Sequence, residues 1–330
     1  MSSSFDSLLA AMAAPGTSVP PADLAFLSDL DATQLERLQK LWTSLTPERR
    51  REILREIGIL ARDHIELNFD RVDRMALEDS DSEVRRLAID NLWECEDPRL
   101  VPQLLHILRS DEDAAARAAA ASALGAFVYL GEVERLPAGL LQDIESELLN
   151  AARHAAQTIR LRSIESLGFS SRPEVPLLIS QAYRSGDEDS RRSALLAMSR
   201  SADEAWATEV QAELRSPSPV LRLEAVRAAG ELELSSSVGD VVDLLEDADL
   251  EVRRAAIWSL GQIGGKRSAE VLGRLLDEAE GEEALLVEDA LDQLAFVDGV
   301  RDFTLLDLDG EAEDEEDEEE TEEGEEEESP

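Results

Sequence analysis

The chain has 330 residues and a formal net charge of −42 at pH 7, and 43% of its residues are hydrophobic although only 4% are aromatic. This length allows a sizeable core or two conventional domains, and Ala and Leu dominate an apolar set that favours an all-α fold. Binding to phosphate backbones needs clustered Lys or Arg, so the acidic balance argues against nucleic acid as a partner.

Cysteine usage and hydropathy indicate the compartment. Cys95 is the only cysteine, so no intramolecular disulfide can form, and a reducing compartment fits best. The apolar run at residues 8–14 is short, has no Lys or Arg before it and follows Asp6, which argues against a cleaved signal peptide. No 18 consecutive apolar residues occur, so we expect no membrane-spanning helix and no membrane partner. The sequence therefore predicts a soluble, cytoplasmic protein.

The N-terminal part precedes any repeat. Residues 1–22 are rich in Ser, Ala and Pro, and we expect them to be disordered. Residues 23–73 are predicted to form capping helices and a degenerate first repeat. Thr46 and Pro47 predict a helix start, because Thr is a good N-cap and Pro costs nothing in a first turn. The amphipathic pattern of one or two capping helices is carried by Leu27, Leu30, Leu35, Leu38, Leu41 and Trp42.

A phrase recurs through residues 74–308. In its clearest copy, DLEVRRAAIWSLGQIGG at residues 249–265, Val252 is followed by Arg253, Ala256, Leu260 and Gly261. Six copies place an arginine at the same position, namely Arg85, Arg117, Arg160, Arg191, Arg222 and Arg253. The intervals are 32, 43, 31, 31 and 31 residues. Degenerate copies flank this run around Arg50 and Leu286, as expected of terminal repeats with one face toward water.

Each repeat is predicted to hold two helices. The apolar stripe of the clearest copy follows one face of a 3.6-residue helix through Val252, Ala255, Ala256, Ser259, Leu260 and Ile263. Gly264 and Gly265 are predicted to end that helix, and a second helix follows at residues 268–278. Pro98, after the N-cap Asp97, and Pro173 predict the starts of other second helices. One such pair cannot bury its stripe alone, whereas stacked copies bury one another's.

The 43-residue interval contains roughly a dozen additional residues, which we place near residues 129–139, between the two helices of that repeat. We expect a lengthened loop, because a longer loop adds little closure entropy. The alternative is a partner-binding insertion, since some solenoid insertions bind partners.

The V-R-x-x-A-x-x-x-L-G run, preceded by an acidic residue at Asp81, Asp113 and Asp249, resembles HEAT repeats, specifically the short bacterial type also called phycobilisome-lyase-like HEAT repeats. The resemblance covers about residues 49–308. It implies an α-solenoid, a right-handed superhelix of helical hairpins whose second helices line the concave face. It implies little about function, because one fold hosts many activities.

Residues 309–330 form an acidic tail. They contain 16 acidic residues among 22 and no base, so we expect them to be disordered. Removing these 16 from the 74 acidic residues leaves 58 against 32 basic ones, a net charge of −26. The predicted solenoid is therefore acidic as well.

The repeated arginines form a ladder with two interpretations. As a binding site, the guanidinium groups would suit an anionic partner or the chain's own tail. As a structural feature, each arginine would meet the acidic residue at the start of a neighbouring repeat's helix, such as Asp249 or Asp81. We favour the structural interpretation, because the arginine flanks the buried stripe rather than opposing it.

No catalytic, cofactor-binding or metal-binding site is predicted. His64, His106 and His154 lie on different repeats and none precedes Glu, unlike the His-Glu pairs of the HEAT-like iron hydroxylases that this fold resembles. A Cys95 nucleophile would need a nearby histidine. The run GQIGGK at residues 261–266 lacks the Ser or Thr of a phosphate loop and follows a helix rather than a strand.

Second-helix positions expected to face the groove are mixed to acidic, namely Gln103, His106, Glu209, Asp240, Asp243 and Glu270. A basic or neutral protein is the better electrostatic match for them, and a solvated face without a dedicated partner is the alternative. We therefore expect a non-catalytic protein–protein interaction scaffold that binds a partner segment in its concave groove. Two further hypotheses stay open, a bilin lyase-like chromophore-handling subunit, and an acidic-tail chaperone or nucleic-acid mimic that binds basic proteins.

Overall fold

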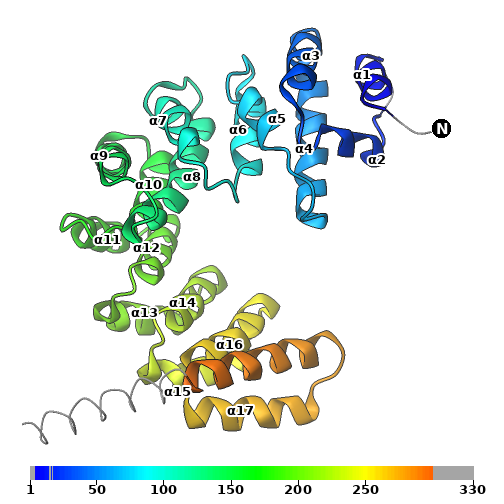
Figure 1. Ribbon diagram of the computed structural model, residues 1–330. Helices are drawn as coiled ribbons and strands as arrows, with labels where there is room; N and C mark the ends of the chain where they lie inside the picture. Colours follow the sequence, from blue (N-terminus) through cyan, green and yellow to red (C-terminus); the bar gives the residue numbers. More distant parts are fainter. Residues whose placement is uncertain (1–3, 15, 17, 300–330) are drawn as a thin grey trace, which may run out of the picture. The chain divides into compact units, whose positions relative to one another are not determined.

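The structure, a computed structural model, describes residues 4–14, 16 and 18–299 (Figure 1). Within these residues every regular element is a helix and no strand occurs. The prediction of an all-α solenoid of helical hairpins is confirmed for this part of the chain. The predicted acidic tail, residues 309–330, lies outside the described residues.

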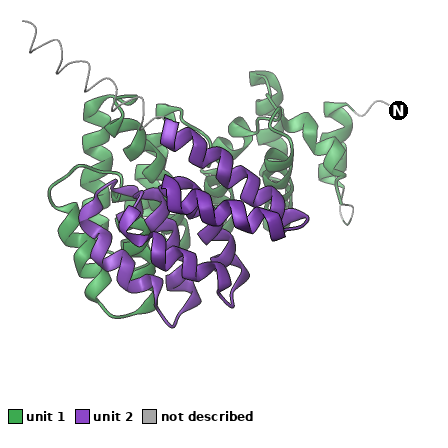
Figure 2. Cartoon of the chain, turned by 90° about the horizontal axis from the view of Figure 1, so that it is seen from below, with its two compact units in different colours: residues 1–197 green, residues 198–330 purple. Residues whose placement is uncertain are grey.

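The chain falls into two compact units, residues 1–197 and 198–330 (Figure 2). The first unit contains α1 (Phe5–Ala13), α2 (Pro21–Leu24), α3 (Ala32–Trp42), α4 (Pro47–Asp63), α5 (Asp70–Ala76), α6 (Ser82–Asn91), α7 (Val101–Ser110), α8 (Ala114–Glu132), α9 (Ala138–His154), α10 (Gln157–Leu167) and α11 (Val175–Arg184). Helix α12 (Glu188–Arg200) spans the division. The second unit contains α13 (Ala207–Leu214), α14 (Pro219–Glu231), α15 (Val238–Asp243), α16 (Leu250–Ile263) and α17 (Gly265–Glu278), and residues 282–299 are also helical.

First helices stack on first helices within each unit. In the first unit α4 packs on α6, α6 on α8 and α8 on α10, while the second helices α5, α7 and α9 pack on the first helix of the following hairpin, α6, α8 and α10 respectively. In the second unit α14 packs on α16, with α13 on α14 and α15 on α16. The apolar stripes are therefore buried between successive hairpins, as the repeats require.

Local sequence signals account for the helix boundaries. The carboxylates of Asp81, Asp113 and Asp249 accept hydrogen bonds from backbone N–H groups in the first turns of α6, α8 and α16. Thr46 caps α4 in the same way, with Pro47 as its first residue. The predicted stripe of α16 is buried throughout, and Gly264 ends the helix at a φ of 68°.

A repeated glycine lets the first helices approach closely. The same bond recurs at three interfaces: Asn91 Nδ2 donates to the Leu54 carbonyl (3.0 Å), Ser166 Oγ to Ala121 (2.8 Å), and Ser259 Oγ to Val226. Each accepting carbonyl lies four residues before a glycine, Gly58, Gly125 and Gly230 respectively. A Cβ atom at Gly125 would lie 2.8 Å from Ser166 Oγ and 3.3 Å from its Cα. The motif glycine is thus a packing residue inside the helix.

The predicted disorder of residues 1–22 is wrong for residues 5–13, which form α1. Ser4 caps this helix by accepting from the backbone N–H of Ser7 at 3.3 Å, and Leu8 and Met12 are fully buried. Helix α1 packs on α3. The Ser- and Ala-rich composition concealed a short apolar stripe that this contact buries.

The additional residues of the long repeat lengthen its helices rather than a loop. Helices α8 and α9 have 19 and 17 residues, whereas α6 and α7 have 10 each. Only residues 133–137 connect α8 to α9, so residues 129–132 belong to α8 and Gly139 to α9. The prediction of a lengthened loop is wrong, because the Ala-rich run contains no helix breaker before Pro137.

Two further boundaries differ from prediction. Pro98 begins a 3₁₀ turn, Pro98–Leu100, before α7 starts at Val101, and α11 begins at Val175, two residues after Pro173.

Helix α8 is long and apolar enough to cross a membrane by length and composition. Counting consecutive apolar residues missed it because Arg117 interrupts the run. Half of its apolar window is buried inside the structure, as in a core helix.

Candidate functional site

The predicted arginine ladder joins successive hairpins through loop aspartates. Arg85 Nε and Nη2 each donate to one carboxylate oxygen of Asp111 at 2.7 Å, and Arg85 Nη1 donates to the Asp79 carbonyl at 2.7 Å. Asp79 in turn accepts from Arg50 Nη1 at 2.6 and 2.7 Å and from Trp42 Nε1 at 2.7 Å. One loop aspartate therefore binds the arginine of the preceding repeat through its carboxylate and the arginine of its own repeat through its carbonyl.

The same arrangement recurs in the second unit. Arg222 donates from Nε and Nη2 to the Asp247 carboxylate at 2.6 and 2.9 Å, and from Nη1 to the Ser216 carbonyl at 2.8 Å. Arg253 Nη1 then donates to the Asp247 carbonyl at 2.7 Å. The pairs are bidentate and half-buried or buried, which is the geometry in which charge-assisted bonds are strongest.

The acidic partner lies two residues before the one predicted. We expected Asp81 or Asp249 to receive the ladder arginine, yet Arg222 binds Asp247. The physical reason is that Asp249 accepts the N–H groups of Glu251 and Val252 in its role as N-cap. Asp81 accepts from the neighbouring Arg51, whose Nε lies 2.8 Å from its carboxylate. A signal for the loop aspartates was present in the sequence, as the D-x-D spacing of residues 79–81, 111–113 and 247–249.

The ladder is incomplete in its middle repeats. Arg117 Nε donates to the Leu108 carbonyl at 2.9 Å, and the guanidinium of Arg160 makes no hydrogen bond or ion pair within the part of the chain that the structure describes. The positions equivalent to Asp111 in the following repeats are His154, Ser185 and Ser216. These lack the carboxylate that Arg85 and Arg222 bind. Arg191 lies half-buried on α12.

Ion pairing lowers the pKa values of the loop aspartates. The Arg222 guanidinium holds the pKa of Asp247 below its usual value, with help from the Asp249 N–H. Burial acts to raise the pKa of Asp111, but Arg85 and the Asp113 N–H together lower it overall. Both carboxylates are therefore ionised at neutral pH.

The six predicted partner-binding residues lie on second helices, as expected, but not on one described surface. Gln103 and His106 lie on α7 in the first unit, half-buried and exposed respectively. The other four, on α13, α15 and α17 of the second unit, are Glu209 (half-buried), Asp240 (half-buried), Asp243 (exposed) and Glu270 (exposed). Asp240 accepts from Arg215 Nη2 at 2.5 Å, and Glu270 lies 4.0 Å from Lys266 Nζ. His106 lines a pocket of about 440 Å³ with Arg85 and Glu112.

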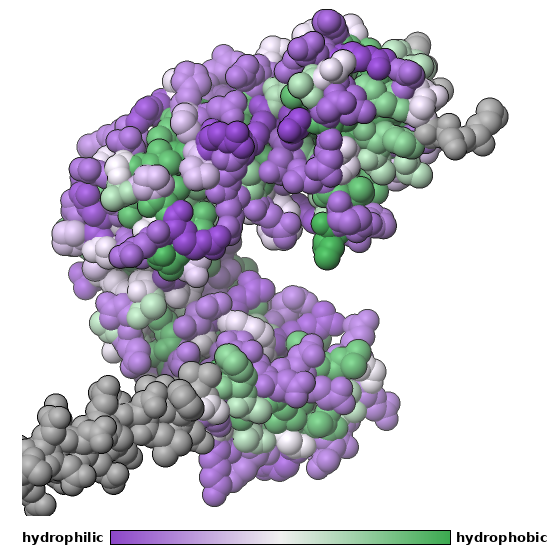
Figure 3. Space-filling view, viewed as in Figure 1, coloured by the Kyte–Doolittle hydropathy of each residue, from purple (hydrophilic) through white to green (hydrophobic). Residues whose placement is uncertain are grey.

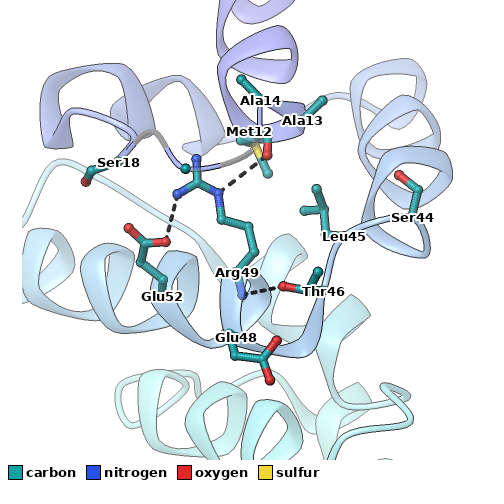
Figure 4. Close-up of a pocket in the computed structure, with 11 residues that line it drawn as sticks. Met12, Ala13, Ala14, Ser18, Ser44, Leu45, Thr46, Glu48, Arg49 and Glu52 are labelled. Carbon is teal, nitrogen blue, oxygen red and sulfur yellow. Dashed lines mark hydrogen bonds and ion pairs between the residues drawn. The ribbon is translucent and has the colours of Figure 1, made fainter.

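A larger pocket, of about 590 Å³, lies between α1 and α4 (Figure 4). Arg49 crosses it and donates to Glu52 at 2.7 Å and to the Ala11 and Met12 carbonyls at 3.2 and 3.4 Å. These bonds satisfy the carbonyls at the end of α1. In Figure 4 the dashed lines join Arg49 to Glu52, Met12 and Thr46, which indicates a tie between α1 and α4 rather than a ligand site.

No catalytic arrangement is assembled from the histidines and the cysteine. His64, His106 and His154 lie exposed on α7 or at the ends of α4 and α9. Cys95 is buried, burial raises the pKa of its thiol, and Arg74 Nη2 donates to its sulfur at 3.3 Å. Within residues 4–14, 16 and 18–299, no three His, Cys, Asp or Glu side chains are grouped as metal ligands.

The stacked helical hairpins and the repeated contacts between ladder arginines and loop aspartates define an α-solenoid. Residues 74–144 and 207–292 match the family model of HEAT repeats. Both units therefore contain HEAT repeats, and the predicted resemblance is confirmed.

Several solved structures are similar to the chain. The CpcE–CpcF complex of phycocyanin lyase from Nostoc sp. PCC7120 is 22% identical, with 68% of this chain and 94% of that chain covered and a TM-score of 0.45. The E. coli protein YibA is 16% identical (86% and 99% covered, TM-score 0.46). Human deoxyhypusine hydroxylase is 16% identical (88% and 96% covered, TM-score 0.35). No curated protein matches the sequence.

Proposed function

We propose that the chain is a non-catalytic scaffold that binds a segment of a partner protein along its second helices. One observation carries this proposal: the stacked hairpins bury the first helices against each other and leave the second helices as neighbouring outer rows. Helix α7 packs beside α9, and α13 and α17 each pack beside α15. Exposed residues of these rows, such as His106, Asp243 and Glu270, are polar, as is the rim of a reversible protein interface.

The charge of the chain supports a basic or neutral partner. A net charge of −42 attracts cationic segments over about one Debye length, roughly 8 Å at physiological ionic strength. The proposal also places the protein in the cytoplasm, because a single cysteine leaves the chain without the intramolecular disulfides typical of secreted proteins.

Charge reversal on the second helices tests the proposal. Chains carrying Asp243→Lys and Glu270→Lys are immobilised beside the wild type, and bound proteins are recovered from an extract of the native host. Glu288→Lys with Asp292→Lys is the matched control, because both residues are exposed in the same unit and the change in charge is equal. We expect retention of the partner to fall about tenfold for the first pair only. Equal retention by both pairs would contradict the second-helix site.

Coexpression tests the absence of catalysis. A bilin and its acceptor protein are produced with and without the chain, and covalent pigment on the acceptor is measured by its absorbance after denaturation. We expect the same background in both cases. Pigment attached only when the chain is present would establish the bilin lyase hypothesis and overturn the non-catalytic one.

A further inference from the structure

One edge of the first unit carries apolar side chains near the C-terminal ends of the first helices in four successive hairpins, three of them exposed and the fourth, Phe169, half-buried. They lie at or just after the C-terminal ends of the first helices α4, α6, α8 and α10: Ile65, Trp93, Tyr129 and Phe169. Ile65 is 96% exposed, Trp93 56% and Tyr129 49%. Hydrophobic side chains are visible at the C-terminal end of α4 in Figure 3. We call these four residues the edge stripe.

The edge stripe consists of two pairs of residues on neighbouring hairpins. Ile65 and Trp93 line the same pocket. The loop after Trp93 is joined to the loop after α8 by the ion pair of Glu96 and Arg135, 2.6 Å apart. The rings of Tyr129 and Phe169 then meet edge to face, with centroids 5.5 Å apart. Exposed apolar residues scattered singly need no explanation, but apolar residues paired along one edge of neighbouring hairpins indicate an interaction surface.

The pocket between Ile65 and Trp93 has a polar floor. Its volume is about 210 Å³, and Asp73, Asn91 and Cys95 line it. Asp73 is only 3% exposed and accepts a hydrogen bond from Asn91 Nδ2 at 2.9 Å. Burial raises the pKa of Asp73 well above its usual value; the bond from Asn91 acts against this, and the nearby Asp70 adds to it. A buried carboxylate with no cation beside it is costly, and a ligand cation would remove that cost.

The rim of this edge is acidic. Glu94 and Glu134 are exposed and take part in no ion pair among the described residues. Two nearby cations are engaged, Arg135 with Glu96 at 2.6 Å and Arg74 with Asp97 at 2.7 Å. The exposed Arg62 in the last turn of α4 offsets only one of the two carboxylates. The charge left for a partner is therefore negative, which favours a basic segment over an acidic one or an anionic membrane surface.

We propose that the edge stripe docks a basic segment of a partner protein, with an arginine or lysine side chain entering the pocket between Ile65 and Trp93. Its aliphatic stem packs on these two side chains and its cationic head faces Asp70 and Asp73. An apolar residue of the same segment covers the rings of Tyr129 and Phe169. This surface rests on the proposed protein-binding function but is distinct from the second helices.

The test uses a fluorescein-labelled ten-residue peptide of alternating arginine and leucine, bound to the full chain and followed by fluorescence anisotropy at physiological salt. We expect Ile65→Ser and Trp93→Ala each to raise the Kd about tenfold. Leu177→Ala is the matched control, because Leu177 is 62% exposed on α11 of the same unit, and its Kd should stay within about twofold of the wild type. A peptide of alternating arginine and serine should bind less tightly than the arginine–leucine peptide. Wild-type affinity in both edge variants would overturn the proposal, since binding would then follow total charge alone.

Asp73→Asn separates recognition from structure. The change keeps the shape of the side chain and removes the buried charge, so we expect the Kd for the peptide to rise about fivefold while the thermal midpoint at pH 7 stays the same or rises. A lower midpoint with an unchanged Kd would show that Asp73 only supports the fold, and would sink the pocket assignment.

The two proposals fail separately. The arginine–leucine peptide should bind the Asp243→Lys, Glu270→Lys chain as it binds the charge-matched Glu288→Lys, Asp292→Lys control. Loss of the difference in partner retention would remove the second-helix site and leave the edge stripe untouched. Weaker peptide binding by the second-helix variant than by its control would place the peptide away from the edge stripe and overturn that proposal instead.

Discussion

Asp247 holds two consecutive repeats together through different atoms. Its carboxylate accepts two bonds from Arg222, its carbonyl accepts one from Arg253, and its Oδ1 also accepts the Asp249 N–H at 2.8 Å. Removing one partner of such a buried pair leaves the other charge uncompensated, which costs more than the pair itself contributes. Single substitutions in the ladder should therefore act through stability.

Arg222→Ala is expected to lower the free energy of unfolding by about 2–4 kcal/mol, because the half-buried Asp247 carboxylate loses two bonds and the Ser216 carbonyl one. Arg227→Ala on the same helix is the control, since Arg227 is exposed and its change should cost less than about 0.5 kcal/mol. Thermal unfolding followed by circular dichroism measures both. Equal midpoints for the two variants would show that the ladder is not structural.

The contribution of this pair depends on pH. The folded-state pKa of Asp247 lies below its unfolded value, so the stabilisation is complete above the unfolded pKa, about 3.9, and is lost as the pH falls through the folded one. The difference in stability between wild type and Arg222→Ala should therefore be constant from pH 5 to 7, and shrink below about pH 4. Urea unfolding at several pH values measures it, and a difference as large at pH 2 as at pH 7 would contradict the role of the ionised carboxylate.

Sequence periodicity predicted the arginines but not the atoms that bind them. Arg222 and Arg253 recur at a fixed interval, so their common role could be inferred. Their partner could not, because both Asp247 and Asp249 have the right charge at nearly the right distance. Only the observation that an N-cap carboxylate is occupied by its own helix decides between them, and this depends on backbone geometry.

At the level of helices, too, some features could be predicted from the sequence and others could not. The stripe of α16 was predictable from its spacing of 3.6 residues, whereas the lengths of α8 and α9 were not, since Ala-rich sequence reads equally well as helix or as tolerant insertion. The close approach of successive first helices at the motif glycine was not predicted either, because the serine that the glycine contacts, such as Ser259 or Ser166, lies in the next repeat. The sequence pattern of a single repeat therefore gives little information about its contacts with the next repeat.

Gly261→Ala should destabilise the second unit by about 1–3 kcal/mol, because the added Cβ would lie 2.7 Å from the Ala290 carbonyl oxygen and force two helices apart. Gly273→Ala is the matched control. Gly273 lies inside α17 with no atom near its missing Cβ, so the change should stabilise by up to about 1 kcal/mol through helix propensity. Urea unfolding distinguishes the two, and a Gly261 variant as stable as the wild type would refute the steric contact.

At the scale of the whole molecule, sequence predicted the solenoid and left the site open. The period of about 31 residues determines stacked hairpins, and the family match in both units agrees with it. A repeat fold offers similar faces many times over, so no single cleft identifies the site. The edge stripe escaped prediction because none of its four residues belongs to a predicted buried stripe. It was found from the exposure of Ile65, Trp93 and Tyr129 and from the ring contact between Tyr129 and Phe169.

Removing residues 309–330, which lie outside the described residues, changes the net charge from −42 to −26. We expect the shorter chain to associate more slowly with the arginine–leucine peptide at low salt, and as fast as the full chain at about 1 M salt, where charges are screened beyond roughly 3 Å. Stopped-flow fluorescence measures the rates. If truncation abolished binding at all salt concentrations, the tail itself would be the site, as the acidic-chaperone hypothesis holds.

Each loop aspartate binds the arginines of two successive repeats, one through its carboxylate and one through its carbonyl. This affects where such a chain can gain or lose whole hairpins. A hairpin with an aspartate equivalent to Asp79 or Asp247 carries both partners of this contact. Its aspartate accepts bonds from the arginine of the preceding hairpin, and its own arginine can donate to the aspartate of the following hairpin. Duplicating that stretch of gene therefore creates a junction already matched on both sides, whereas a copy of the His154 junction would inherit none of this bonding. Growth or loss of whole hairpins should be best tolerated at the junctions that carry this contact.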